Sequence, residues 1–165
     1  MTDVPELESP RTTTYNVVFV CTGNTCRSPM AEALARREIA RRDWQHIRVA
    51  SAGLAAQPGH PASPQAVAVA RRQGMELASH RSRPFTRETL DWADLILAMS
   101  PSHVYAIERM GGGDKVALLG EFATGEEYPI SDPFGSDEAT YEETLRELEP
   151  LIEAVFDRLA PILHP

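Results

Sequence analysis

The stretch that decides the fold reads Val17-Val18-Phe19-Val20-Cys21-Thr22-Gly23-Asn24-Thr25-Cys26-Arg27-Ser28-Pro29-Met30. Its first four residues form a continuous β-branched and aromatic run, which is typical of a strand covered on both faces in a parallel sheet. The run stops at Cys21, and a turn containing Gly23 and Asn24 follows. Ser28 and Pro29 then match an N-cap and a first helical residue. The stretch therefore predicts a strand, a loop and a helix.

The same alternation continues along the chain. We expect strands near 47–50, 93–98 and 115–118, and helices over about 64–74 and from 101 onward. A long loop over 120–136 leads into a last amphipathic helix, which Pro150 should kink or divide because proline removes a backbone donor. The apolar residues of that helix are Tyr141, Leu145, Leu148, Ile152, Val155 and Leu159. Strands alternating with helices predict a doubly wound α/β fold, with about four parallel strands and helices on both faces.

Size and composition favour one domain. The chain has 165 residues, enough for one sizeable core. Residues 1–13 are polar and contain Pro5 and Pro10, which predicts a flexible tail before a single domain over 14–165. The opening lacks the basic start and apolar stretch of an export signal, and no apolar run is long enough to span a bilayer. We therefore expect a cytoplasmic protein.

The charge balance narrows the choice of partners. A net charge of −8 argues against nucleic acid and anionic membranes as partners. Four clustered arginines, at 36, 37, 41 and 42, have acidic neighbours and fit a solvated helix face. The chain has two cysteines, too few for a disulfide framework, and their close spacing suits a reducing compartment where thiols do chemistry.

The loop after the first strand has the features of a phosphate site. In an open α/β sheet it lies at the carboxyl edge, where ligands bind, and its N–H groups and the helix N-terminus converge on an anion. The positive potential of these N–H groups and of Arg27 favours the thiolate form of Cys21. Ser28 can also donate a hydrogen bond to the sulfur. The planar Arg27 guanidinium matches two phosphoryl oxygens. Cys21 alone would suit a small buried residue, but the joint pattern favours a phosphatase with Cys21 as nucleophile.

The sequence resembles the low-molecular-weight protein phosphatase family through 18–32, 51–53, 80–81, 93–95 and 132–134. The resemblance covers nearly all of the chain after the tail. It implies a flavodoxin-like architecture and a two-step hydrolysis, without cofactor, through a cysteinyl-phosphate intermediate. It also implies inorganic phosphate as the product. Substrate contacts are expected from Thr22, Gly23, Asn24, Thr25, Cys26, Ser28 and Phe134.

The general acid is expected from Asp132. By itself Ser131-Asp132-Pro133 is a common turn. In the family, an Asp-Pro-aromatic motif at this place provides the acid, which later activates water as a base. The resemblance therefore implies that Asp132 is catalytic and that Phe134 forms a wall of the entry slot.

The resemblance also implies a supporting shell. Asn24 tolerates a left-handed conformation, and the family pattern links it by hydrogen bonds to Ser51 and His80. His80 alone would fit an ordinary core histidine. The five histidines are scattered, so we expect no metal. Cys26 fits two interpretations equally, a reversible disulfide with Cys21 or a buried loop-packing residue.

The substrate is the most open question. Family members acting on phosphotyrosine usually have an aliphatic residue where this chain has Thr25, and tyrosine where it has Phe134. The chain looks more like the bacterial branch that dephosphorylates protein arginine. A hydroxyl at Thr25 can pair with a polar guanidinium, although it could instead cap the loop. Phosphotyrosine proteins remain the alternative substrates.

Two other classes fit less well. A thiol-dependent arsenate reductase on this scaffold needs further resolving cysteines, and none follows Cys26. A module that only captures phosphorylated partners should lack the nucleophile, the arginine or the acid, and all three are present. The sequence therefore favours an enzyme acting on phosphorylated proteins.

Overall fold

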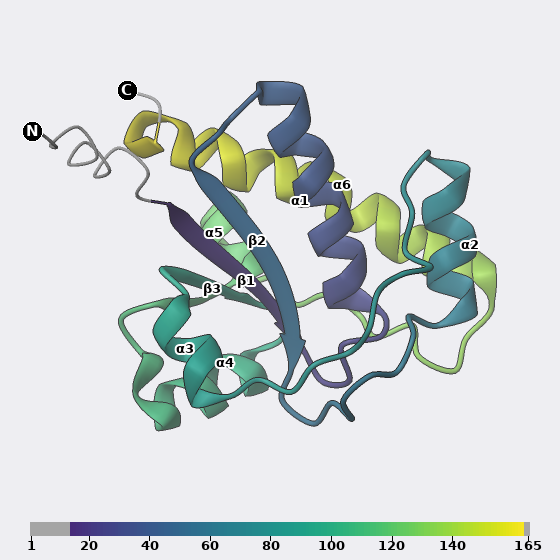
Figure 1. Cartoon of the computed structure of the whole chain (residues 1–165), viewed down its shortest axis with the longest axis horizontal. Helices are drawn as coiled ribbons and strands as arrows, with labels where there is room; N and C mark the ends of the chain where they lie inside the picture. The colour runs from purple at the N-terminus through teal and green to yellow at the C-terminus, as the bar shows by residue number, and fades with distance from the viewer. Residues whose placement is uncertain (1–13, 164–165) are drawn as a thin grey trace, which may run out of the picture.

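The computed structural model describes residues 14–163, so the predicted tail over 1–13 lies outside the described part. Its centre is a four-stranded sheet with the order β2-β1-β3-β4, and all neighbouring strands are parallel (Figure 1). The strands are β1 (Tyr15–Cys21), β2 (Ile47–Gly53), β3 (Leu95–Ala98) and β4 (Val116–Leu118). This confirms the predicted parallel sheet.

Helices cover both faces of the sheet. Val17 and Phe19 of β1 face a core built with α1 (Arg27–Arg42), α2 (Pro64–Arg72), α5 (Leu119–Thr124) and α6 (Glu138–Leu163). Val18 and Val20 face a smaller core with α3 (Arg87–Trp92) and α4 (Pro101–Ile107). All four β1 side chains are fully buried, which explains the unbroken apolar run in the sequence. The doubly wound fold is thereby confirmed.

The strand register brings the site to one edge. Cys21 at the end of β1 pairs with Gly53 at the end of β2, and Val20 pairs with Ala98 at the end of β3. Because parallel strands finish together, the segments that follow them meet at this edge. The loop over 22–26 leaves β1 here and enters α1.

Four details of the helices differ from the sequence predictions. α1 begins at Arg27 with Cys26 as its N-cap residue, so the predicted N-cap role of Ser28 is wrong. α6 runs through Pro150 as one helix, so the predicted division is also wrong. The predicted loop after residue 120 begins with α5, and α3 was not predicted.

Packing accounts for the continuity of α6. Leu148 and Leu151 on either side of Pro150 are buried, while Pro150 itself is exposed. Burial of the apolar face outweighs the loss of one backbone hydrogen bond.

η2 (Glu108–Gly112) follows α4, and Gly111 within it has a φ of 95°. No helix in the described range 14–163 has the length and apolar character needed to cross a membrane.

Candidate active site

The loop between β1 and α1 is held in place by its neighbours. Asn24 has a φ of 59°, the left-handed conformation that was predicted for it. The Arg83 N–H donates to Asn24 Oδ1 over 2.9 Å, and His80 Nε2 lies 2.8 Å from the Asn24 carbonyl oxygen. Because a carbonyl only accepts, His80 Nε2 carries the hydrogen. The structure therefore joins His80 to the loop, as the resemblance implied.

The sulfur of Cys21 lies at the start of this loop. Cys21 Sγ is 2.9 Å from Ser28 Oγ, and Asn24 Nδ2 donates to both Ser28 Oγ and Ser51 Oγ, each over 2.9 Å. Within the described chain, no backbone N–H of residues 23–26 donates to a protein acceptor. These donors remain available to an anion bound beside the sulfur.

Arg27 adds a positively charged guanidinium to the site. Its side chain is nearly buried; Nη1 donates to the Ile130 carbonyl over 3.0 Å, and Nη2 is 3.4 Å from Asp132 Oδ2. The buried Nε has no hydrogen-bond partner among residues 14–163. A buried donor without a partner is unfavourable, and a phosphoryl oxygen would satisfy it.

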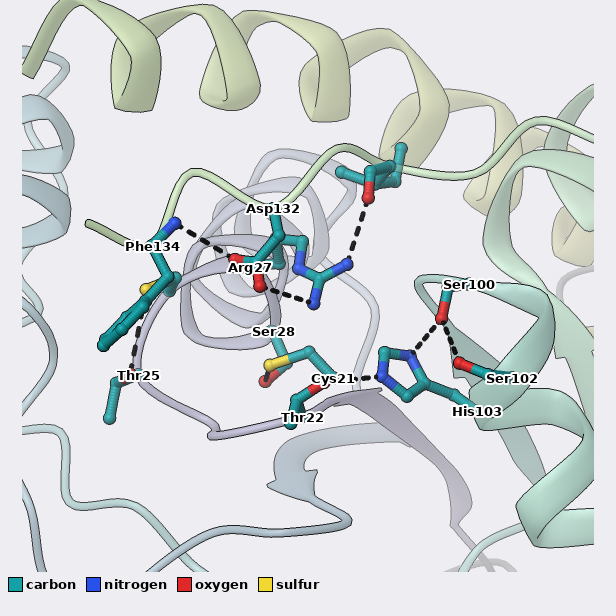
Figure 2. Close-up of polar contacts among 12 residues, drawn as sticks. Cys21, Thr22, Thr25, Arg27, Ser28, Ser100, Ser102, His103, Asp132 and Phe134 are labelled. Atoms are coloured by element: carbon teal, nitrogen blue, oxygen red, sulfur yellow. Dashed lines mark hydrogen bonds and ion pairs between the residues drawn. The ribbon is translucent and has the colours of Figure 1, made fainter. Parts of the chain in front are cut away.

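Asp132 and Phe134 come from the loop before α6 and lie at the mouth of the site (Figure 2). The Asp132 side chain is 49% exposed, and its Oδ1 accepts a hydrogen bond from the Phe134 N–H over 3.1 Å. The Phe134 ring is 72% exposed. The loop therefore presents a carboxyl group and an aromatic surface to an incoming substrate.

Thr25 and Cys26 are the next of the loop residues predicted from the sequence. The Thr25 hydroxyl makes only a weak contact within the described chain, 3.7 Å to Cys26 Sγ. Cys26 Sγ lies 3.1 Å from Tyr141 Oη and 3.7 Å from Ser63 Oγ. Burial and then the contact with Cys26 raise the pKa of Tyr141 to about 12. Both cysteines are free thiols, so Cys26 packs in the loop here, and its pairing with Cys21 stays a prediction.

His103 was missed from the sequence. It lies on α4, is 6% exposed, and its Nε2 is 2.9 Å from Thr22 Oγ1 while Nδ1 is 3.0 Å from Ser100 Oγ. Burial and then the positive charge of Arg27 lower the pKa of His103 to about 4, although Asp132 opposes the shift. His103 is therefore neutral at pH 7. Its position just after β3, at the carboxyl edge of the sheet, was a signal that could have found it.

The described residues contain no group of three or more His, Cys, Asp or Glu side chains placed to hold a metal ion. The arrangement joins a thiol, a hydroxyl donor, a buried guanidinium and a half-exposed carboxyl group. Such a set suits transfer of an anionic group to sulfur, with a proton donor nearby.

The comparison with protein families agrees with this chemistry. Residues 16–161 match the family described as low molecular weight phosphotyrosine protein phosphatase. The match spans most of the chain, and the chain therefore belongs to this family of phosphatases.

Particular relatives narrow the class further. The protein-arginine-phosphatase of Bacillus subtilis (strain 168) is 42% identical over 146 residues, 87% of this chain and 96% of the relative. The probable low molecular weight protein-tyrosine-phosphatase EpsP of Ralstonia nicotianae is 34% identical over 145 residues. The match covers 87% of this chain and 94% of the relative. A solved structure of the YwlE arginine phosphatase, a mutant with a phosphorylated active-site serine, has a TM-score of 0.83 at 40% identity. The superposition covers 87% of this chain and 95% of the YwlE chain.

Proposed function

We propose that this chain is a cytoplasmic phosphatase that removes phosphate from phosphoarginine residues of proteins, with Cys21 as nucleophile, Arg27 as phosphate ligand and Asp132 as general acid. The observation that carries the proposal is that, within residues 14–163, the buried Arg27 Nε has no partner and the N–H groups of residues 23–26 have no protein acceptor. Together they offer several donors to one dianion. Two thiols without a disulfide suit a reducing compartment.

In the first step the Cys21 thiolate attacks phosphorus and the bond from phosphorus to the arginine nitrogen breaks. Asp132 donates its proton to the departing nitrogen, so the product leaves as an ordinary arginine side chain. Arg27 and the loop N–H groups hold the three phosphoryl oxygens as charge redistributes. The result is a phosphorylated Cys21 and an ionised Asp132.

In the second step Asp132 accepts a proton from water, and the water oxygen attacks phosphorus. The bond between sulfur and phosphorus breaks, and inorganic phosphate leaves. The departing sulfur is stabilised as a thiolate by Ser28, whose Oγ lies 2.9 Å away. Asp132 ends protonated, ready for the next substrate.

Thr25 supports phosphoarginine rather than phosphotyrosine. Its hydroxyl makes no hydrogen bond to backbone within the described chain, which disfavours the alternative of a loop-capping role. The hydroxyl is therefore available to pair with a guanidinium donor, which an aliphatic side chain would leave unsatisfied. The 42% identity to an arginine phosphatase favours the same substrate. The exposed Phe134 ring can pack on a planar guanidinium as well as on a phenyl ring.

The proposal is tested with matched phosphoarginine and phosphotyrosine peptides, using wild type and Thr25→Ile. Wild type should prefer phosphoarginine, and the substitution should shift the ratio of kcat/KM toward phosphotyrosine by about tenfold or more, the effect of one unpaired polar group. Cys21→Ser is the control that assigns turnover to this site. Equal preference in both active proteins would remove Thr25 as the discriminator, and a wild-type preference for phosphotyrosine would contradict the substrate assignment.

A further inference from the structure

Glu32 has no part in the chemistry described so far, yet it is joined to the site. It lies on α1, four residues after Ser28, and its side chain is 16% exposed. Its Oε1 accepts a hydrogen bond of 2.6 Å from Ser51 Oγ of β2. Its other oxygen, Oε2, accepts from Nε and Nη2 of Arg36. Glu32 thus connects a buried hydroxyl of the site to an arginine at the surface.

The hydrogen bonds around Asn24 have a fixed direction because the groups at both ends act in one sense only. The Arg83 backbone N–H can only donate, so Asn24 turns Oδ1 toward it and its amide NH2 toward Ser28 and Ser51. At the opposite end the Glu32 carboxylate can only accept, so Ser51 gives it its hydrogen. Ser51 therefore presents a lone pair to Asn24.

The consequence reaches the sulfur of Cys21. Ser28 Oγ accepts from Asn24, and its own hydrogen is then free to point at Cys21 Sγ, 2.9 Å away. A sulfur that receives this hydrogen bond is stabilised as a thiolate, because the charged sulfur is a stronger acceptor than the neutral thiol.

We propose that Glu32 is a positioning residue for the nucleophile: through Ser51 it anchors the Asn24 amide, and through Asn24 it keeps the Ser28 hydroxyl directed at Cys21. The proposal rests on the function proposed above, in which Cys21 attacks phosphorus. It adds a fifth side chain to the hydrogen-bonded set formed by Cys21, Ser28, Asn24 and Ser51.

Glutamine at position 32 cannot replace the carboxylate. With its amide nitrogen toward Arg36, two donors face one another, and the oxygen left to Ser51 is uncharged and therefore a weaker acceptor than a carboxylate. With the nitrogen toward Ser51, the buried Ser51 hydroxyl loses its acceptor. Either orientation weakens the anchor of Asn24, although the size of the side chain hardly changes.

The direction in which the ionisation of Cys21 shifts when Glu32 is replaced distinguishes this role from that of a charge alone. Acting only through space, the negative charge of Glu32 disfavours a thiolate, so its removal would make Cys21 ionise at lower pH. Acting through the hydrogen bonds, its removal weakens the contact from Ser28, so Cys21 ionises at higher pH. The two roles predict opposite shifts.

The experiment measures alkylation of Cys21 by iodoacetamide against pH, with the modified residue located by fragmentation of the peptide so that Cys26 is counted separately. For Glu32→Gln we expect the midpoint pH of alkylation to rise by about 0.5 to 1 unit. At a pH below the midpoint, kcat/KM should fall by about threefold to tenfold, the corresponding change in the thiolate fraction of the free enzyme. In a Ser51→Ala background the same substitution should cause no further change, because the connection is already broken.

Glu38→Gln is the matched control. Glu38 lies on the same helix and has its own arginine four residues later, Arg42, but it does not contact Ser51. Its substitution should leave the midpoint unchanged, and thermal unfolding monitors the stability of every variant. An unchanged or lowered midpoint in folded Glu32→Gln would overturn the proposal, as would an equal shift in the Ser51→Ala background. Full turnover by Cys21→Ser would instead overturn the proposed function.

Discussion

Gly53 allows the phosphate loop to approach β2, and its replacement by alanine should displace that loop. A Cβ at this position would lie 2.5 Å from the Thr22 carbonyl oxygen and 2.9 Å from the Asn24 backbone nitrogen. Ordinary contacts of a Cβ begin near 3.4 Å, so the two backbones must separate by about 0.9 Å (3.4 − 2.5). A displacement of about 1 Å at a catalytic group costs roughly a hundredfold in rate. Overpacking of this kind also destabilises by about 1–3 kcal/mol.

The assay combines kcat/KM on a phosphoarginine peptide with chemical denaturation of Gly53→Ala. We expect a loss of about a hundredfold in kcat/KM in a protein that still folds cooperatively. Gly113→Ala is the matched control. A Cβ there would lie 3.8 Å from its nearest neighbour, Glu108 Cγ, which is an ordinary contact, and Gly113 is not part of the loop. Wild-type activity and stability in Gly53→Ala would refute the reasoning that close approach of the loop to β2 positions the site.

Three further substitutions test other parts of the site. Asp132→Asn should lower kcat/KM, which reports the first step, by about a hundredfold or more, with a smaller effect on substrates whose leaving group needs no proton, and equal losses of kcat/KM on both kinds of substrate would exclude the acid role. For His103, a pKa lowered to about 4 from 6.5 means that the unfolded chain takes up the proton first as pH falls. Stability should therefore decrease between pH 6.5 and 4 by about 3 kcal/mol, and His103→Gln should remove that part of the decrease in denaturation curves at pH 7 and 4.5. Tyr141→Phe removes the hydroxyl next to Cys26 and should destabilise by about 1 kcal/mol without changing kcat; a large loss of activity would assign Tyr141 a role in the site.

The fold was predictable because its main signals are local. The run at 17–20 predicts a strand buried on both faces, and both faces of β1 are indeed covered. Short helices were harder. α3 depends on a capping box between Thr86 and Thr89, and α5 follows β4 without a polar cap. Of the two effects predicted for Pro150, a kink or a division, the division is wrong, because it weighed one lost hydrogen bond and not the packing of a 26-residue helix.

In the site too, residues that are neighbours in sequence were easier to predict than residues that only the fold brings together. The loop residues and Arg27 are neighbours in sequence, so their spacing predicted their chemistry. Ser28 was expected both to cap the helix and to donate to Cys21; its hydroxyl lies 2.9 Å from the sulfur, and its contact with Asn24 is what the tertiary structure adds. His103 and Glu32 contact partners 81 and 19 residues away in sequence. The place of His103 after a strand was a signal for the edge of the sheet, but no local pattern marks the partners themselves.

The central claim is that the Cys21 sulfur accepts the phosphoryl group from the substrate. Rapid quenching of the enzyme during turnover, followed by mass analysis of its peptides, tests this claim directly. We predict the mass of one added phosphoryl group on Cys21 of the wild type, and no turnover in Cys21→Ser. A phosphoryl group found on another residue, or turnover by Cys21→Ser at the wild-type rate, would contradict the account.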